Sequence, residues 1–295
     1  MELDKIAIDN YKKAGAIART VREEAKKMVK PGLPLIELAD ALEKKIREAG
    51  GVPAWPVNIS INEVAAHYSP SKDDESKIKE GDLVKVDIGV AIDGYIADTS
   101  VSVALDENDQ VLVEAAEKAL DEAIKLVKPG ADVADISAKI AEVISDFGVK
   151  PIVNLTGHGL DQYVIHTEPK IPNHAGEFHY ILEEGEVIAI EPFTTRGRNF
   201  INESDFDRAL TYTLAEEKPV RSPEARKVIQ EVRDRRGMPF TNRWLSLGGI
   251  KLRIAMKELT DRECIHAYRI LKGDSKIAQA EHTVLVLKEP IVITR

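Results

Sequence analysis

The stretch Lys85-Val86-Asp87-Ile88-Gly89-Val90-Ala91-Ile92-Asp93-Gly94-Tyr95-Ile96-Ala97-Asp98-Thr99-Ser100-Val101-Ser102 has the pattern of one antiparallel β-hairpin. Asp93-Gly94 is the turn signal, because both central residues of a type I′ turn need positive φ. A two-residue turn at this position fixes the register, so Gly89 pairs with Asp98 and Asp87 pairs with Ser100. Asp87 and Asp98 are then diagonal neighbours on the polar face, within side-chain reach of each other.

Two carboxylates held this close repel each other, and the repulsion raises the pKa of one of them. A divalent cation bound between Asp87 and Asp98 would satisfy both charges. The simpler interpretation is a solvated face of the sheet. For an isolated pair of aspartates the sequence does not decide between these two interpretations.

The composition predicts a globular protein and argues against several classes of function. The 295 residues are 43% hydrophobic and 31% charged, which is enough apolar material for a substantial core. The net charge of -9 argues against non-specific binding to nucleic acid or to an anionic membrane, which needs a positive field. Cys264 is the only cysteine, so we expect no internal disulfide and a reducing, cytoplasmic compartment. We expect no signal peptide and no membrane span, because no run approaches about 20 apolar residues.

A diverged internal repeat runs through the chain, and it bears directly on the fold. Three segments recur in the same order at nearly constant separation. The matched segments are 29–32 with 127–130, 57–60 with 153–156, and 81–87 with 185–191. The last match aligns Asp87 with Glu191.

Each copy of the repeat has the pattern of a helix, a Lys-Pro-Gly break, a second helix and then short strands. Apolar residues at helical spacing predict helices over residues 5–29, 35–49, 109–127 and 132–146. Two such halves indicate an α+β fold, with one antiparallel sheet backed by four helices and a pseudo-twofold axis between the halves. A site on that axis would take matching ligands from both halves.

Residues 213–266 do not follow this repeat. They are rich in charge and mostly helical in pattern, with helices expected over 222–236 and 244–259. Ser222-Pro223 is a helix start, with a serine N-cap and a proline at the first helical position. We interpret 213–266 as a helical insertion in a domain formed by residues 1–212 and 267–295.

Three further residues could join the two aspartates. His158 lies between glycines in Thr156-Gly157-His158-Gly159, which we interpret as a loop that presents the imidazole. Glu191 and Glu281 each interrupt an apolar strand pattern, where a carboxylate lies on the wet face or pairs with a positive group. Taken singly, each of these residues has the simpler explanation of a solvated or satisfied side chain.

The five residues together predict a site for two divalent metal ions. Four carboxylates balance the charge of two such ions, and carboxylates with one histidine favour Mn, Fe, Co or Zn. Water bound to such ions has its pKa lowered toward about 7 and becomes a nucleophile for hydrolysis. The residues alone do not decide whether a carbonyl or a phosphoryl group is attacked.

The ordered set Asp87, Asp98, His158, Glu191 and Glu281 resembles the metal ligands of the methionine aminopeptidases, which are metallopeptidases with the pita-bread fold. The resemblance covers essentially the whole chain and is nearest to the type 2 enzymes of archaea and eukaryotes, which carry a helical insertion. Supporting motifs are Pro53-Ala54-Trp55-Pro56, Asn62-Glu63-Val64-Ala65-Ala66-His67-Tyr68, Asn154-Leu155-Thr156-Gly157-His158, Arg243-Trp244-Leu245 and Gln279-Ala280-Glu281-His282-Thr283.

The resemblance implies a role for each metal ligand. Asp87 would chelate the first metal, and Asp98 and Glu281 would bridge both metals. His158 and Glu191 would complete the second, and Glu191 would also handle protons as a catalytic residue. The implied activity is removal of the initiator methionine from N-terminal methionyl peptides and nascent chains, with preference for a small second residue. The identity of the two ions, among Co, Mn, Fe and Zn, stays open.

The resemblance also implies a substrate pocket. His67 would lie near the N-terminal end of the substrate, and His166 would hydrogen-bond the scissile peptide and stabilise the oxyanion. Trp55 and Tyr268 would line the pocket for the methionine side chain. Trp55 stands where the family usually has phenylalanine, and Thr167-Glu168 stands where Ala-Gly is common.

Two other functions compete with this interpretation. An X-Pro dipeptidase or aminopeptidase P has a similar ligand set but a large extra N-terminal domain, whereas here the first predicted helix pair begins almost at Met1. A non-catalytic binding protein of the same fold would lack metal ligands, whereas this chain has all five. We expect a cytoplasmic monomer that binds neither nucleic acid nor membranes.

Overall fold

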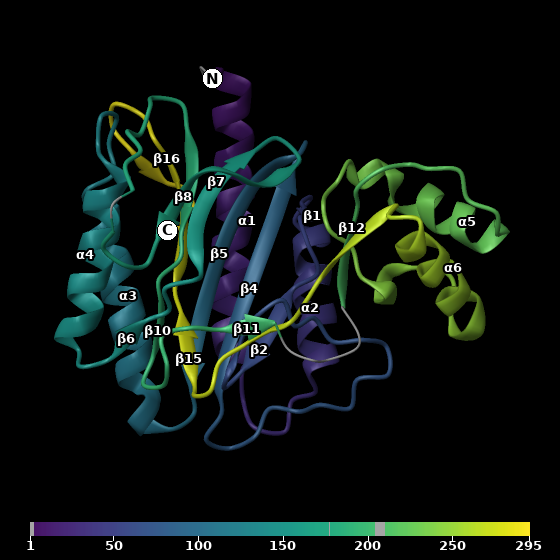
Figure 1. The fold of residues 1–295 in the computed structure, drawn as a ribbon, viewed down its shortest axis with the longest axis horizontal. Coiled ribbons are helices and arrows are strands. Elements are labelled where there is room, and N and C mark those ends of the chain that lie inside the picture. Colours follow the sequence, from purple (N-terminus) through teal and green to yellow (C-terminus); the bar gives the residue numbers. More distant parts are fainter. Residues whose placement is uncertain (1–2, 177, 204–209) are drawn as a thin grey trace.

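The predicted hairpin forms at the centre of the sheet (Figure 1), and its strand pairing has the predicted register. The computed structural model describes residues 3–176, 178–203 and 210–295, and in it β4 (Leu83–Ile92) pairs antiparallel with β5 (Tyr95–Ala104). The turn residues Asp93 and Gly94 have φ angles of 50° and 83°, as a type I′ turn requires. Gly89 pairs with Asp98 and Asp87 with Ser100, so both aspartates lie on one face of the ribbon.

The hairpin belongs to a nine-stranded antiparallel sheet with the order β1-β4-β5-β16-β9-β7-β8. Strand β16 pairs with β5 on one side and with β9 on the other, so it joins the two halves of the chain. Strand β2 pairs with β4, and β17 pairs with β16. The remaining strands of this sheet are β1 (Val52–Pro53), β2 (Asn58–Ile61), β7 (Thr156–Asp161), β8 (Val164–Pro172), β9 (Val187–Ile190), β16 (Glu281–Leu285) and β17 (Ile291–Val292).

Two helix pairs back the sheet, one for each half, as the repeat predicts (Figure 1). They are α1 (Lys5–Met28) with α2 (Leu35–Glu48), and α3 (Gln110–Ile124) with α4 (Val133–Asp146). Helix α1 packs on β4 and β5 with small residues, and a Cβ on Gly15 would lie 2.2 Å from the carbonyl oxygen of Ile293. Each pair covers its own hydrophobic core, one around Leu38 and Val86 and the other around Ile136 and Ile188.

Two small sheets lie beside the main one, and they show where the sequence interpretation was wrong. The apolar pattern around Glu281, which we interpreted as one strand, divides at Ala280 into β15 (Ile277–Gln279) and β16. The Ala280 N–H donates to the carbonyl oxygen of Pro192, which takes the chain from one sheet into the other. The small sheets are β15 with β10 (Phe193–Thr195) and β6 (Lys150–Pro151), and β11 (Asn202–Glu203) with β14 (Leu271–Lys272) and β3 (Val64–Ala66).

The expected insertion begins and ends at a pair of antiparallel strands, β12 (Thr211–Leu214) and β13 (Ile265–Tyr268). Helices α5 (Pro223–Val232) and α6 (Gly249–Asp261) pack together on a small core of their own. The helix predicted over 244–259 was wrong at its start, because residues up to Trp244 form a 3-10 turn and Leu245 is extended. The domain limits at 213–266 stay a prediction. Within the described ranges, no helix is long and apolar enough to cross a membrane.

Candidate metal centre

The five predicted metal ligands face one cavity of about 550 Å³ on the face of the main sheet opposite the helices. Each ligand comes from a different strand or strand end of that sheet. Asp87 lies in β4, Asp98 in β5 and His158 in β7, whereas Glu191 directly follows β9 and Glu281 begins β16. The hairpin and the second half of the chain therefore contribute to the same site.

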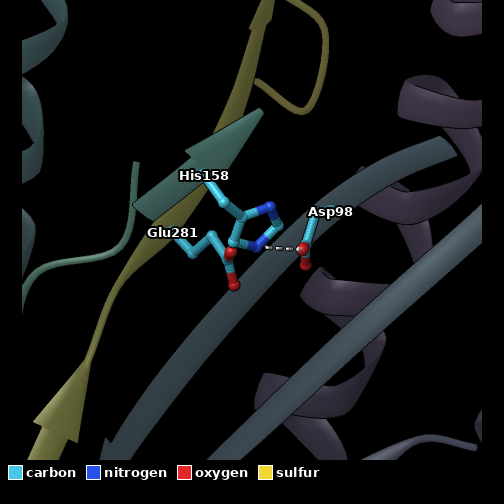
Figure 2. Close-up of side chains that lie close together, drawn as sticks. All are labelled: Asp98, His158 and Glu281. Atoms are coloured by element: carbon cyan, nitrogen blue, oxygen red, sulfur yellow. Dashed lines mark ion pairs between the residues drawn. The ribbon is translucent and has the colours of Figure 1, made fainter. Parts of the chain in front are cut away.

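The ligand atoms lie within coordination reach of one another (Figure 2). One atom each from Asp98, His158 and Glu281 forms a group with all separations within 4.8 Å. The Nε2 atom of His158 lies 3.7 Å from Asp98 Oδ2 and 3.7 Å from Glu191 Oε1. One ion could contact several of these atoms without a large rearrangement.

His158 lies in a strand, and the loop we expected around it was wrong. His158 pairs with Ala189 of β9, and its side chain is buried. The flanking glycines have a packing reason, because a Cβ on Gly157 would lie 2.4 Å from the Ala189 carbonyl oxygen and one on Gly159 would lie 2.1 Å from the Glu168 carbonyl oxygen. The glycines therefore allow close approach of neighbouring strands instead of forming a loop.

The hydrogen bonding of His158 leaves a metal-binding nitrogen free. Its Nδ1 lies 3.1 Å from the Gly159 carbonyl oxygen, which only accepts, so Nδ1 carries the proton. The lone pair is then on Nε2, which points toward Asp98 and Glu191. Burial lowers the pKa of His158 to about 4, so the imidazole is neutral near pH 7 and in the form that binds metals.

Within the described part of the chain, too few positive or hydrogen-bond-donating groups surround the four carboxylates to balance their charge. Burial raises the pKa of Asp87 to about 6, although the Trp55 indole N–H donates to it at 3.2 Å. Burial and repulsion from neighbouring carboxylates raise the pKa values of Asp98, Glu191 and Glu281 as well. The Oδ1 atom of Asp98 is buried, and none of the described residues donates a hydrogen bond to it. Four carboxylates, one of them with an unsatisfied oxygen, and one neutral imidazole fit divalent ions such as Mn, Fe, Co or Zn.

The two other predicted histidines line the same cavity. The His166 ring meets the His158 ring edge-on at 4.5 Å, and the His67 ring meets that of Tyr268 at 5.6 Å. Burial first, and the neighbouring histidines second, lower the pKa of His166 to about 3. Burial also lowers the pKa of His67, whose Nδ1 donates to the Arg269 carbonyl oxygen at 2.9 Å. His67 therefore presents an accepting Nε2, and His166 presents a neutral ring that can donate one hydrogen bond.

An apolar wall lies beside these polar groups. Trp55 and Tyr268 both line the cavity, together with Leu155, Ile165, Phe193 and Leu271. That these two aromatic residues enclose the methionine side chain stays a prediction. The Trp55 indole packs against Gly89 of β4. A Cβ at this position would lie only 2.5 Å from the ring atoms, so the contact requires glycine. The cavity is also lined by Glu168 and Lys170 of β8, by Thr211 of β12 and by Pro239 of the expected insertion.

Two polar residues that support the site were not recognised from the sequence. The side-chain amide of Gln279 donates to Glu191 at 3.2 Å and to Glu281 at 3.3 Å, which links ligands from two strands. The buried ammonium of Lys85 donates to the carbonyl oxygens of Asn62 at 3.1 Å and Ile277 at 2.7 Å. The available signals were the place of Gln279 two residues before Glu281 and that of Lys85 two residues before Asp87.

Comparison with known proteins identifies the family. The sequence model for metallopeptidase family M24 matches residues 9–287. A methionine aminopeptidase of Thermococcus onnurineus is 43% identical over 288 residues, which cover 96% of this chain and 97% of that protein. Among solved structures, a thermophilic Arx1 superposes with a TM-score of 0.86 at 20% identity, covering 98% of this chain and 91% of that one. The methionine aminopeptidase of Thermotoga maritima superposes with a TM-score of 0.73 at 22% identity, covering 99% and 98%.

The two structural matches show the pita-bread fold alone, since their sequences are distant. The Thermococcus relative, in contrast, is similar enough over nearly its whole length to assign this chain to a family. The chain belongs to metallopeptidase family M24 and, within it, to the methionine aminopeptidases.

Proposed function

We propose that this protein removes the N-terminal methionine from peptides and nascent chains by hydrolysis at a centre of two divalent ions, with preference for a small second residue. One observation carries the proposal: the five ligands, two neutral histidines and an apolar wall all face one cavity. The relatives named methionine aminopeptidases support the choice of substrate. The cytoplasmic location and the monomeric state stay predictions.

The metal ions would be held by Asp87, Asp98, His158, Glu191 and Glu281. Divalent ions bound there would supply an acidified water and polarise the scissile carbonyl. Asp98 and Glu281 come from paired strands at the middle of the sheet, which suits them to bridge two ions. These buried carboxylates must lose their protons to bind metal. Because their pKa values are raised, metal binding would displace protons from the site.

The remaining groups of the cavity would act on the peptide. Glu191, which Gln279 orients by a hydrogen bond, would take a proton from the attacking water and deliver it to the leaving amine. Neutral His166 would donate a hydrogen bond to the oxyanion that develops on the scissile carbonyl. His67 would accept a hydrogen bond from the substrate backbone near its N-terminus. Trp55 and Tyr268 would enclose the methionine side chain.

Peptide hydrolysis tests the proposal against its closest competitor. With saturating Mn²⁺ or Co²⁺, we expect rapid cleavage of Met-Ala-Ser and negligible cleavage of an X-Pro dipeptide. Preference for the X-Pro dipeptide would assign the protein to the proline dipeptidases instead. A matched Met-Leu-Ser peptide should react slowly, because a small second residue is expected.

Metal analysis tests the site itself. We expect the folded protein to bind two divalent ions per chain at saturation, by calorimetry and by elemental analysis after gel filtration. Binding of fewer than one ion would contradict the two-metal site and would favour a non-catalytic binding protein.

A further inference from the structure

We propose that the helical insertion positions Trp55, and through it sets how strictly the cavity selects the first side chain of the substrate. The selectivity part of this inference rests on the proposed function. Two sets of polar contacts join residues 235–244 to the loop 53–57, and they hold this loop on both sides of Trp55.

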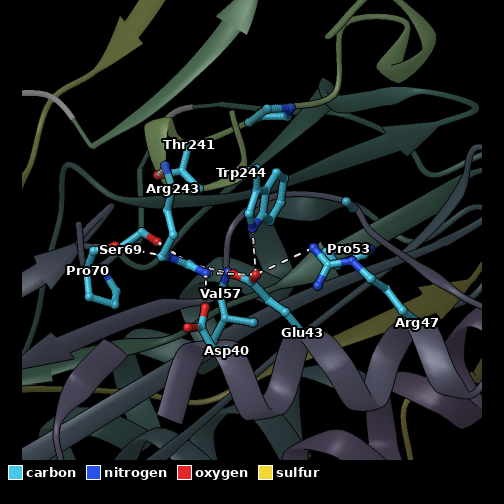
Figure 3. A network of polar contacts seen from close by, with 12 residues as sticks. Asp40, Glu43, Arg47, Pro53, Val57, Ser69, Pro70, Thr241, Arg243 and Trp244 are labelled. Atoms are coloured by element: carbon cyan, nitrogen blue, oxygen red, sulfur yellow. Dashed lines mark hydrogen bonds and ion pairs between the residues drawn. The ribbon is translucent and has the colours of Figure 1, made fainter. Parts of the chain in front are cut away.

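The first set gathers around the carboxylate of Glu43 in α2 (Figure 3). Arg243 donates to both oxygens of this carboxylate, at 2.9 and 2.6 Å, and the Trp244 indole N–H donates to it at 2.6 Å. The backbone N–H of Val57 donates to the same carboxylate at 3.2 Å. The side chains of Glu43 and Arg243 are only 1% and 5% exposed. One buried carboxylate thus joins the insertion to the residue two positions after Trp55.

Arg243 also contacts the segment that follows β3. Its guanidinium donates to the carbonyl oxygen of Pro70 at 3.1 Å and to Ser69 Oγ at 3.4 Å, and it pairs with Asp40 at 2.5 Å. Burying an ion pair costs desolvation, which is repaid only when its remaining donors and acceptors are satisfied in a good geometry. Because almost every donor of Arg243 has a partner here, few alternative placements of residues 243–244 are compatible with the same contacts.

The second set is made by Arg235, at the end of the turn that follows α5. One terminal nitrogen of its guanidinium donates to the carbonyl oxygens of Pro53 at 2.8 Å and Ala54 at 2.9 Å. Its Nε donates to the carbonyl oxygens of Met238 and Pro239. The guanidinium also stacks on the Trp244 ring, with 4.8 Å between its carbon and the ring centroid. Arg235 therefore holds the two residues immediately before Trp55 and joins this contact to the first set.

The held loop connects directly to the metal site. Trp55 donates to Asp87 Oδ1 at 3.2 Å and packs on the backbone of Gly89. The carbonyl oxygen of Gly89 in turn accepts from Ala54 N at 2.9 Å. A shift of the loop would change both the width of the apolar pocket and the hydrogen bond to a predicted metal ligand. We assign Arg235, Glu43 and Arg243 as positioning residues, since they reach the substrate only through Trp55.

Replacement of Arg235 by methionine tests the inference, because methionine keeps the apolar stem and removes the donors. We expect kcat/KM for Met-Ala-Ser divided by that for Leu-Ala-Ser to fall roughly tenfold, within the range for contacts in an apolar pocket. The change should appear mainly in KM for the methionyl peptide. Arg233→Met is the matched control, because among the described residues Arg233 forms its ion pair with Glu217, on the surface of the same insertion.

A spectroscopic measurement reports on Trp55 without any substrate. The chain has two tryptophans, so 5-fluorotryptophan labelling gives two ¹⁹F resonances, and Trp55→Phe identifies the one from Trp55. We expect the Trp55 resonance to shift or broaden in Arg235→Met and to stay unchanged in Arg233→Met. Arg235→Lys, measured in parallel, keeps the charge but cannot reproduce the planar fork, so it should give the same changes at smaller size.

Unchanged selectivity together with an unchanged Trp55 resonance in folded Arg235→Met or Arg235→Lys would overturn the inference and leave these contacts a purely structural role. Failure of the wild-type protein to cleave methionyl peptides would instead overturn the proposed function. In that case the fluorine spectra still decide whether the insertion positions Trp55.

Discussion

The two ends of the cavity are built in different ways. At the metal end, the predicted ligands come from strands of one sheet whose register is fixed by short turns and ladder hydrogen bonds. At the side-chain end, Trp55 lies on a loop that is held by Arg235 and by the Glu43–Arg243 pair, which are distant in sequence. The chemistry thus depends on backbone pairing, whereas the shape of the pocket depends on side-chain contacts with the insertion. Substitutions at the two ends should accordingly differ in kind and in size.

The largest effect is expected from removing a bridging ligand at the metal end. Asp98→Ala should lower kcat by at least about a hundredfold to a thousandfold, which is the loss seen when one group that stabilises a transition state is removed. Bound metal should fall in parallel, measured by calorimetry, with the circular dichroism spectrum unchanged. Asp135→Ala, an exposed aspartate of α4, is the control. Substantial turnover by Asp98→Ala at saturating metal would contradict the bridging role.

A smaller effect is expected from Gln279, which touches two predicted ligands without binding metal itself. Gln279→Leu keeps the size of the side chain and removes the donor shared by Glu191 and Glu281. Partners of metal ligands typically contribute about 10- to 100-fold in metal affinity or activity, so we expect a loss in this range. Titration of the metal-free protein with Mn²⁺ measures it. Gln162→Leu, at an exposed position, should bind metal like the wild type, and equal affinity in Gln279→Leu would show that the amide does not orient the ligands.

Metal removal should destabilise the protein in a pH-dependent way. In the folded metal-free protein the pKa of Asp87 is raised to about 6, and those of Asp98, Glu191 and Glu281 are also raised. Between the ordinary carboxyl pKa of about 4 and these values, the folded state binds more protons than the unfolded chain. The stability contributed by these protons is complete below about pH 4 and is lost as the pH rises through the raised pKa values, that of Asp87 being about 6.

Thermal unfolding with and without a chelator measures this effect. We expect the loss in Tm on metal removal to be several degrees larger at about pH 7.5 than at about pH 5. An equal or smaller loss in Tm at the higher pH would contradict the repulsion among the four carboxylates.

The difference between the two ends of the cavity, backbone pairing at one and distant side-chain contacts at the other, explains which features the sequence could predict. The Asp93-Gly94 turn determines the pairing of β4 with β5 locally, so the side-chain alternation placed Asp87 and Asp98 on one face without knowledge of the fold. The repeat then aligned Asp87 with Glu191, because duplicated strands keep their place in a sheet. The helix pairs followed from apolar periodicity, which depends on neighbours three and four residues away.

The features that the sequence did not predict depend on distant segments. The glycines beside His158 are typical of a loop, yet they are required by strands β8 and β9, which approach too closely for a Cβ. The helical pattern from residue 244 does not start a helix, because Trp244 is held by Glu43 of α2. Gln279 lies two residues before Glu281, but its second partner, Glu191, comes close only when β9 and β16 pair, so the sequence does not show that one amide contacts both carboxylates.

The smallest effect is expected at Trp55 itself, and it links the two ends of the cavity. Trp55→Phe removes the donor to Asp87 and leaves space beside Gly89, so peptides with a longer first side chain should gain roughly threefold to tenfold relative to methionyl peptides. Kinetics with Met-Ala-Ser and an ethionyl analogue measure this ratio. Loss of the indole N–H should also raise the pKa of Asp87 further and weaken metal binding at acid pH.

Combining Trp55→Phe with Arg235→Met tells whether the pocket and the insertion act through one route. If Arg235 acts only by placing the indole, its effect on selectivity should largely disappear once the indole is gone, so the two changes should be far from additive. For the wild type, the two single variants and the double variant, the quantity compared is kcat/KM for Met-Ala-Ser divided by that for the ethionyl analogue. This ratio cancels any loss of active protein that affects both peptides equally. Additive effects would mean that the insertion shapes the pocket directly, through rim residues such as Pro239. The loop of Trp55 would then be held by its own contacts with β4.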